Sequence, residues 1–212
     1  MIFKKDLMKT ILRILFFINI LIFSNHIYSQ RFNGGIHAGV SATQVSGDEQ
    51  AGFNKAGIYG GGFVNIYFTQ KSSVQLELNF IQKGSRKNPK PDNGDYTKYV
   101  CRLNYIEMPL MYKLDVAKWL TFEIGVSAAY LVKSSEEDEN GPVSPYLQFK
   151  KYEISLIGGG YYNFSKHFMV NVRYENTLPF LPIRQHASRA SHLLNKGQYN
   201  SVLVFALQYQ FK

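Results

Sequence analysis

The sequence is short of cysteine, of charge and of long apolar runs. Cys101 is the single cysteine among 212 residues, which excludes a disulfide framework within the chain. After residue 30, no apolar run approaches the roughly 20 residues that a membrane helix requires, so a helical membrane protein is excluded. Charged residues make up 18% of the chain and aromatic residues 15%, a balance that argues against disorder and against a highly charged soluble surface. We expect one compact domain, or at most two small ones, facing something other than water over part of its surface.

The first 29 residues have the composition of an export signal. Four basic side chains precede a mostly apolar stretch, residues 14–23, and the polar residues that follow include Ser29, which suits signal peptidase. A membrane anchor is the weaker alternative, because this apolar stretch is too short to span a bilayer. No cysteine lies near the cut to carry a lipid anchor. The sequence therefore predicts a signal peptide over residues 1–29 and an exported domain over residues 30–212.

From Phe32 onward, apolar residues alternate with small or polar residues, the pattern of half-buried strands. Eight segments show it: residues 32–43, 58–68, 74–80, 99–114, 120–130, 152–159, 168–175 and 203–211. Their connections alternate between long ones (residues 45–56, 84–98, 133–148 and 179–195) and short ones (residues 69–72, 115–118 and 165–167). Short turns on one side and long loops on the other are typical of outer-membrane barrels. We predict an all-β fold, an eight-stranded antiparallel up-and-down transmembrane β-barrel.

Within this barrel the more apolar parity of each strand should face lipid and the other parity the interior. The inward side chains that carry charge or an amide are predicted to pair with one another: Gln75, Glu77, Glu123, Glu153, Arg173 and Glu175. Eight strands enclose little more than their own side chains, so an open pore is not expected. Aromatic residues near strand ends are predicted to form interfacial girdles: Tyr67, Phe68, Tyr99, Tyr112, Trp119, Tyr130, Tyr152, Tyr174 and Tyr209.

The motifs that could carry chemistry are weak. The glycine triplets at residues 60–62 and 158–160 precede neither a helix nor a Lys-Ser/Thr pair, so they predict curvature of the wall and not a phosphate loop. His186 and His192 are the only histidines near metal-ligand spacing, and no cysteine accompanies them. Cys101 is interpreted as a buried or lipid-facing thiol. The sequence therefore predicts no catalytic, cofactor-binding or metal-binding residues and no cofactor.

Basic residues gather in two of the long loops. One group is Lys83, Arg86, Lys87 and Lys90, and the other is Arg184, Arg189 and Lys196. Because long loops of such barrels face the outside, these groups suggest contact with outer-membrane lipid and the phosphates of lipopolysaccharide. Nucleic acid is not an expected partner of an exported protein.

Three stretches of the chain carry a family likeness: residues 32–39, residues 76–84 and, most specifically, residues 104–110, which read Asn-Tyr-Ile-Glu-Met-Pro-Leu. In these stretches the chain resembles the PorT-like outer-membrane β-barrel proteins. The resemblance implies an integral outer-membrane barrel, and the family's namesake is associated with a protein-secretion apparatus. A secretion-apparatus or periplasmic protein is therefore a candidate partner. Pro109 lacks an N–H group, so we also expect a β-bulge there that flips the strand's parity.

Three functional hypotheses follow. The first is a non-enzymatic outer-membrane barrel with a structural, adhesive or secretion-accessory role. The second is an outer-membrane enzyme that modifies lipid or lipopolysaccharide, which would require His37 or His167 to lie beside a serine and a glutamate. The third is a soluble barrel that binds a small apolar ligand in its mouth. The sequence favours the first.

Overall fold

The computed structural model describes residues 31–48, 52–143, 147–185, 191–192 and 195–211 of the chain. The predicted signal peptide lies outside the described residues. Within them, no helix combines the length and the hydropathy needed to cross a bilayer. Most of the described chain is strand, as the two-residue alternation predicts.

Eight long strands, each of 10 to 19 residues, make up the body of the fold. In chain order they are β1 (Arg31–Ser46), β2 (Lys55–Tyr67), β3 (Ser72–Lys87), β4 (Tyr99–Ala117), β5 (Leu120–Asp138), β7 (Tyr152–Asn163), β8 (Phe168–Thr177) and β11 (Tyr199–Gln210). The other elements are short: the 3-10 helix η1 (Pro91–Asn93) and the strands β6 (Gly141–Val143), β9 (Ser191–His192) and β10 (Asn195–Lys196).

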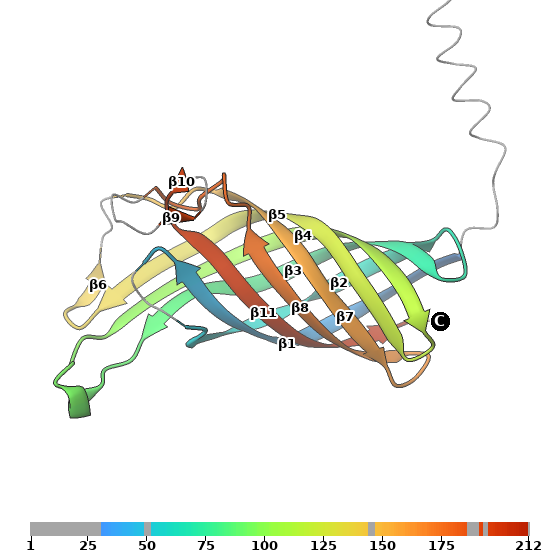
Figure 1. Cartoon of the computed structure of the whole chain (residues 1–212), viewed down its shortest axis with the longest axis horizontal. Coiled ribbons are helices and arrows are strands. Elements are labelled where there is room, and N and C mark those ends of the chain that lie inside the picture. Colours follow the sequence, from blue (N-terminus) through green and yellow to red (C-terminus); the bar gives the residue numbers. More distant parts are fainter. Residues whose placement is uncertain (1–30, 49–51, 144–146, 186–190, 193–194, 212) are drawn as a thin grey trace, which may run out of the picture. The chain divides into compact units, whose positions relative to one another are not determined.

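The long strands close into a barrel. Their order around the wall is β4, β3, β2, β1, β11, β8, β7 and β5, and the pairing of β4 with β5 joins the two ends (Figure 1). The first and last strands pair antiparallel, from Gly35 opposite Gln210 to Ser46 opposite Tyr199. This closed antiparallel barrel confirms the predicted fold class. It leaves no sheet edge whose N–H and C=O groups would be unpaired in hydrocarbon.

The two ends of the barrel differ in the length of their connections. Residues 68–71, 118–119 and 164–167 make short turns at one end, which we call the short-turn end. Residues 47–54, 88–98, 139–151 and 178–198 connect strands at the other end, the long-loop end. This confirms the predicted alternation of connections. In bacterial outer-membrane barrels the short turns are periplasmic and the long loops extracellular.

The outer surface of the barrel is apolar. Large hydrophobic side chains stand exposed along every long strand, among them Ile36, Val64, Leu78, Met108, Ile124, Leu156, Val172 and Phe205. Aromatic rings are exposed on this surface too, such as Trp119 with Tyr162 and Tyr130 with Tyr152, whose centroids are 6.2 and 5.4 Å apart. A continuous apolar face of this kind is suited to lipid and not to water. Of the predicted girdle residues, Tyr67 and Tyr99 are not among the exposed ones.

Two glycines allow neighbouring strands of the barrel wall to approach each other closely. A Cβ atom on Gly61 would lie 2.2 Å from the Leu78 carbonyl oxygen, and one on Gly159 would lie 2.6 Å from the Val172 carbonyl oxygen. Both distances are too short for a side chain. The central glycine of each triplet therefore has a structural role, because it relieves crowding in the barrel wall, as predicted for these motifs.

Two sequence expectations about strand detail are wrong. The strands run further than predicted: β3 continues to Lys87 and β5 to Asp138, into stretches expected to be loops. Pro109 causes no bulge, because it pairs in register with Ser127 and the alternation of buried and exposed side chains continues through it. The register shifts between β4 and β5 lie instead between Asn104 and Tyr105 and between Asp115 and Ala117.

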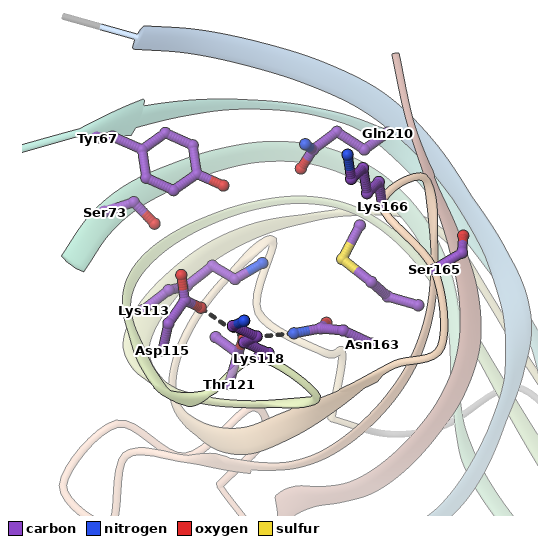
Figure 2. Close-up of a pocket in the computed structure, with 11 residues that line it drawn as sticks. Tyr67, Ser73, Lys113, Asp115, Lys118, Thr121, Asn163, Ser165, Lys166 and Gln210 are labelled. Carbon is purple, nitrogen blue, oxygen red and sulfur yellow. Dashed lines mark hydrogen bonds between the residues drawn. The ribbon is translucent and has the colours of Figure 1, made fainter. Parts of the chain in front are cut away.

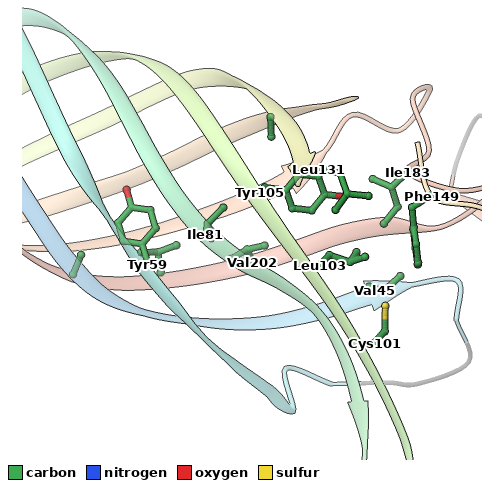
Figure 3. Packing of buried hydrophobic residues seen from close by; sticks show 13 residues of the cluster. Val45, Tyr59, Ile81, Cys101, Leu103, Tyr105, Leu131, Phe149, Ile183 and Val202 are labelled. Atoms are coloured by element: carbon green, nitrogen blue, oxygen red, sulfur yellow. The ribbon is translucent and has the colours of Figure 1, made fainter. Parts of the chain in front are cut away.

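A cluster of buried apolar side chains lies toward the long-loop end. It includes Val45, Cys101, Leu103, Leu131, Phe149, Ile183 and Val202 (Figure 3). The interior is therefore not polar along its whole length, which the strand alternation alone does not predict. Cys101 is a free, buried thiol, so the buried alternative for this residue is the correct one.

Candidate functional site

An arginine network crosses the middle of the lumen. Arg173 on β8 donates through Nη1 and Nη2 to both oxygens of Glu77 on β3, at 2.9 Å each. It also donates to both oxygens of Glu123 on β5, at 3.0 and 3.1 Å. The hydroxyls of Tyr59 and Tyr161 accept from the same guanidinium at 3.0 and 3.1 Å. All five side chains are buried, so the charges are paired and hydrogen-bonded, as buried ions require.

The arginine network extends onto β1 through His37. The His37 imidazole shares a hydrogen bond of 2.7 Å with Asn79 Oδ1, and Asn79 in turn donates to Glu77 Oε2 at 2.8 Å. The imidazole also stacks on the Tyr59 ring at 5.0 Å between centroids. The Phe63 ring also stacks on the imidazole, at 6.1 Å between centroids, so three wall side chains hold His37.

A second set, the lysine network, lies beside the first. Lys83 on β3 pairs with three buried carboxylates, those of Glu107, Glu153 and Glu175, and the closest pair is with Glu175 on β8. Thr177 Oγ1 donates to Glu153 at 2.6 Å, and Asn200 Nδ2 donates to the same carboxylate at 2.9 Å. One ammonium therefore serves three carboxylates.

Both networks join β3 to β8, strands that β2, β1 and β11 separate around the wall. The contacts therefore cross the lumen and do not merely run between neighbours. The sequence predicted the inward direction of Gln75, Glu77, Glu123, Glu153, Arg173 and Glu175, and all six are buried. An interior crossed in this way is filled by its own side chains, as expected for eight strands.

Lys83 corrects one sequence assignment. It was expected on an extracellular loop, yet it is fully buried in the lysine network. Its place on β3 has a simple reason, because it shares the parity of the inward residues Gln75, Glu77 and Asn79. That parity, carried four residues further along the strand, is the signal that could have identified it.

The remaining basic loop residues have different fates. Arg86 and Lys90 are exposed near the long-loop end. Lys87 pairs with Asp95 at 3.0 Å. Hydrogen bonds from Thr97, and then the Lys87 ammonium, lower the pKa of the Asp95 carboxyl to about 2. Arg189 and His186 lie outside the described residues, and so do the side chains of Lys196 and His192.

Arg184 lies at the long-loop end and is likewise not a free surface cation. It is mostly buried, and its Nη1 and Nη2 donate to the two oxygens of Glu136 at 2.9 and 2.8 Å. Its Nε donates to Gln198 Oε1 at 2.8 Å, and the Phe149 ring lies 4.1 Å from its guanidinium carbon. We call Glu136, Phe149, Arg184 and Gln198 the loop clasp. Burial opposes the charge of Arg184, but the Glu136 carboxylate outweighs it and raises the pKa of the guanidinium.

The clasp fastens two loop segments to each other. The Lys150 amide donates to the Ile183 carbonyl at 2.7 Å, and Arg184 Nη1 reaches the Leu147 carbonyl at 3.4 Å. Ile183 is fully buried in the apolar cluster below. Residues 147–151 and 181–184 therefore fold over the cluster.

The short-turn mouth is built differently, around a pocket (Figure 2). Its volume is about 170 Å³, and its lining includes Lys113, Lys118, Lys166, Asp115 and Tyr67. Every long strand except β1 contributes a lining residue or ends at a turn that does. The pocket is therefore a product of closure, and no single segment of the sequence predicts it.

The residues weighed for catalysis do not come together. His37 lies inside the arginine network, whereas the His167 imidazole lies 3.0 Å from the Gln210 carbonyl oxygen at the short-turn end. In the described part of the chain, neither ring hydrogen-bonds a serine hydroxyl, and no three His, Cys, Asp or Glu side chains are grouped to hold a metal ion.

Comparison with known proteins agrees with the barrel. Residues 23–178 match the family model described as outer membrane protein beta-barrel domain. The Neisserial surface protein A structure has a TM-score of 0.51 at 12% identity, covering 84% of this chain and 97% of that one. The attachment invasion locus protein Ail of Yersinia pestis has a TM-score of 0.50 at 13% identity, covering 84% and 98%. These two structures share the fold. None of the curated proteins matches significantly.

Proposed function

Because the chain belongs to the outer membrane protein beta-barrel domain family, we propose that it is a non-catalytic outer-membrane barrel with a structural or secretion-accessory role. Its long-loop end would contact the partner. The observation that carries this proposal is the bridging of the lumen from β3 to β8 by Arg173 with Glu77 and by Lys83 with Glu175. A barrel filled by its own ion pairs is suited to be a scaffold and not a passage.

The long-loop end offers a projecting surface for such contact. The β3–β4 connection with η1 and the β5–β6 hairpin extend beyond the ends of the other strands (Figure 1). Arg86 and Lys90 are exposed there, and Arg102 forms an exposed pair with Glu137 at 2.6 Å. Exposed cations on a projecting hairpin favour an anionic partner, such as lipopolysaccharide phosphates or an acidic protein surface.

The resemblance to PorT-like proteins is the reason for including a secretion-accessory role. Its most specific stretch lies on β4, where Tyr105 and Glu107 face the interior and Ile106, Met108 and Leu110 face outward. Glu107 belongs to the lysine network. The resemblance in this stretch therefore concerns the interior of the barrel. The secretion-accessory role needs a direct test of the protein's partners.

The test is a pull-down from detergent-solubilised outer membranes. A tagged wild-type barrel is compared with a variant in which residues 88–98 are replaced by a short Asn-Gly turn, and heat-modified gel mobility verifies that both are folded. We expect a defined protein, such as a secretion-apparatus subunit, to be captured by the wild type and lost by the variant. Identical captured sets would contradict contact through the projecting hairpin.

Two further measurements separate the alternatives. Binding to lipopolysaccharide vesicles should weaken in Arg86→Gln/Lys90→Gln and stay unchanged in Lys71→Gln, a lysine at the opposite end. Unchanged binding in the double variant would remove lipopolysaccharide as the contact. In cell fractionation we expect the protein in the outer membrane; recovery from the soluble periplasm without detergent would favour the soluble ligand-binding barrel instead.

A further inference from the structure

The pocket at the short-turn mouth has no part in the function proposed above. Its volume of about 170 Å³ compares with roughly 30 Å³ for one molecule of liquid water, so it has room for about six waters or for a small anion with part of its hydration shell. Figure 2 shows the Lys113 side chain extending into this space, with Lys118 and Lys166 also on the lining.

The charges of the pocket do not balance. Three of its lining residues are lysines, and Asp115 is the single acid among them. The Asp115 carboxylate accepts from Thr121 Oγ1 at 2.6 Å, and Thr121 Oγ1 accepts from Asn163 Nδ2 at 3.0 Å. Within the described residues, no ion pair of 4.0 Å or less joins Asp115 to a lysine. The Asp115 carboxylate is thus held against the wall by Thr121 and does not neutralise a lysine of the pocket.

Lys113 is the unusual member, because it is buried and forms no ion pair of 4.0 Å or less with any described residue. Only 5% of the residue is exposed. Its Nζ donates to Gln75 Oε1 at 2.9 Å and lies 3.6 Å from the centroid of the Tyr161 ring, and both partners are neutral. The neighbouring carboxylates of the lumen, Glu77 and Glu123, are both engaged by Arg173.

A buried ammonium with only neutral partners is costly, and a neutral amide and a ring offset part of that cost. An anion that entered the pocket would meet this ammonium with its charge still unmatched. The rim lysines Lys118 and Lys166 are exposed and free to turn toward it, and Ser73 adds a hydroxyl to the lining. Charge-assisted hydrogen bonds of this kind are the strong ones.

We infer that the pocket binds a small oxyanion, a carboxylate or a phosphate group, with Lys113 at its base and Lys118 and Lys166 at its rim. The short-turn end of such barrels is periplasmic, so the anion comes from the periplasm. It is either a free ion or the terminal carboxylate of a peptide, and both present the same chemistry to the lysines.

The test uses methionine methyl NMR on the full-length protein folded in detergent micelles. Met169 lines the pocket, whereas Met108 is exposed on the outer face of β4, so the second methyl group is an internal control. Sodium phosphate and sodium acetate are titrated at constant ionic strength. We expect the Met169 methyl resonance to shift and saturate while that of Met108 stays still.

Three variants assign the effect to the lysines. Lys113→Met keeps an unbranched side chain and removes its charge, and it should weaken binding at least about tenfold. The double variant Lys118→Gln/Lys166→Gln changes only exposed side chains, so it remains informative if Lys113→Met fails to fold, and it should weaken binding about tenfold. Lys71→Gln lies in a short turn at the same end but outside the pocket lining, and it should bind as the wild type does.

A short peptide with a free carboxyl end, compared with its amidated form, identifies the source of the anion. Tighter binding of the free peptide than of acetate supports a peptide end, and equal binding supports a free ion. A Met169 resonance that no anion moves would overturn the inference. Affinity that survives both Lys113→Met and the double rim variant would also overturn it.

Discussion

Each mouth of the barrel holds a buried cation, and the two cations are treated in opposite ways. At the long-loop mouth, Arg184 makes two hydrogen bonds to Glu136 and packs on the Phe149 ring. At the short-turn mouth, Lys113 has a neutral amide and an aromatic ring and no carboxylate within 4.0 Å in the described chain. At the long-loop end, residues 147–151 and 181–184 fold over the apolar cluster, and at the short-turn end Lys113 lines a pocket.

The difference shows how the same chemical group can fasten a structure or leave a place for a ligand. A cation whose counter-ion belongs to the same chain stabilises the fold, because removing either partner leaves the other as an unpaired charge in a low dielectric. A cation without a counter-ion in the chain adds little to stability, and its charge is available to an anionic ligand that enters the barrel. The predictions below test this contrast, from the largest effect to the smallest.

The largest effect is expected from Lys83→Met. This change leaves the carboxylates of Glu107, Glu153 and Glu175 facing one another without their cation, and we expect a loss of about 4 kcal/mol in the free energy of unfolding. Lys113→Met removes an equally buried ammonium that has no counter-ion, so its effect should stay below about 1 kcal/mol in either direction. Urea unfolding in lipid vesicles, followed by the fluorescence of the single tryptophan, Trp119, measures both. Equal losses would break the contrast.

Arg184→Ala tests the clasp itself. It leaves the buried Glu136 carboxylate without its cation, so we expect a loss of about 3 kcal/mol in the same unfolding measurement. The matched control is Arg102→Ala, because the pair of Arg102 with Glu137 belongs to the same end of the barrel but is exposed. The control should unfold as the wild type does. A control as damaging as Arg184→Ala would show that the end as a whole is fragile and that the clasp has no special role.

The thiol of Cys101 reports whether the clasp covers what lies beneath it. Cys101 is buried in the same apolar cluster as Phe149 and Ile183, and it is the only cysteine of the chain. A maleimide should label the wild type slowly, and Arg184→Ala should increase the labelling rate about tenfold by opening the loops. Mass spectrometry over time gives the rates. Rapid labelling of the wild type would mean that the long-loop mouth is open.

The smallest effect concerns the exposed hairpin tip outside the clasp. Because the pKa of Asp95 is lowered from 3.8 to about 2, its hydrogen bonds stabilise the tip fully above pH 3.8, and this contribution is lost as the pH falls through about 2. Thr97→Val should move the Asp95 titration midpoint back toward 3.8, as followed by NMR of its carboxyl carbon. Thr69→Val at the short-turn end is the control and should leave the midpoint where it is.

The sequence predicts the architecture well because alternate residues of each strand in a membrane barrel face the lipid and the lumen. The eight segments, the alternating connections and the inward direction of Glu77 and Arg173 all follow from that period of two. The expectation at Pro109 failed for an instructive reason. A missing N–H interrupts hydrogen bonding, yet β4 has strands on both sides that keep it in register, so the strand needs no extra residue.

What the sequence does not predict is the height of each residue along the barrel. Parity tells which face a side chain takes, but the stagger between strands decides which inward side chains meet. It is this stagger that brings Glu77 on β3 to Arg173 and Lys83 on the same strand to Glu175. The pocket around Lys113 depends on the same stagger across seven strands. For Lys83 and Arg184 the error lay instead in assuming that a basic residue assigned to a long loop must face water.

The ion pairs that run from β3 to β8 also bear on how such a wall can be assembled. A half-inserted sheet that contained β3 but not yet β8 would place the Glu77 carboxylate in the hydrocarbon core without Arg173 to neutralise it. Partial states are thereby made unfavourable, because β8 must be in place before the charges on β3 are neutralised within the bilayer. Insertion of this chain should consequently be all-or-none, with the last segments made completing the charge pattern begun by the first.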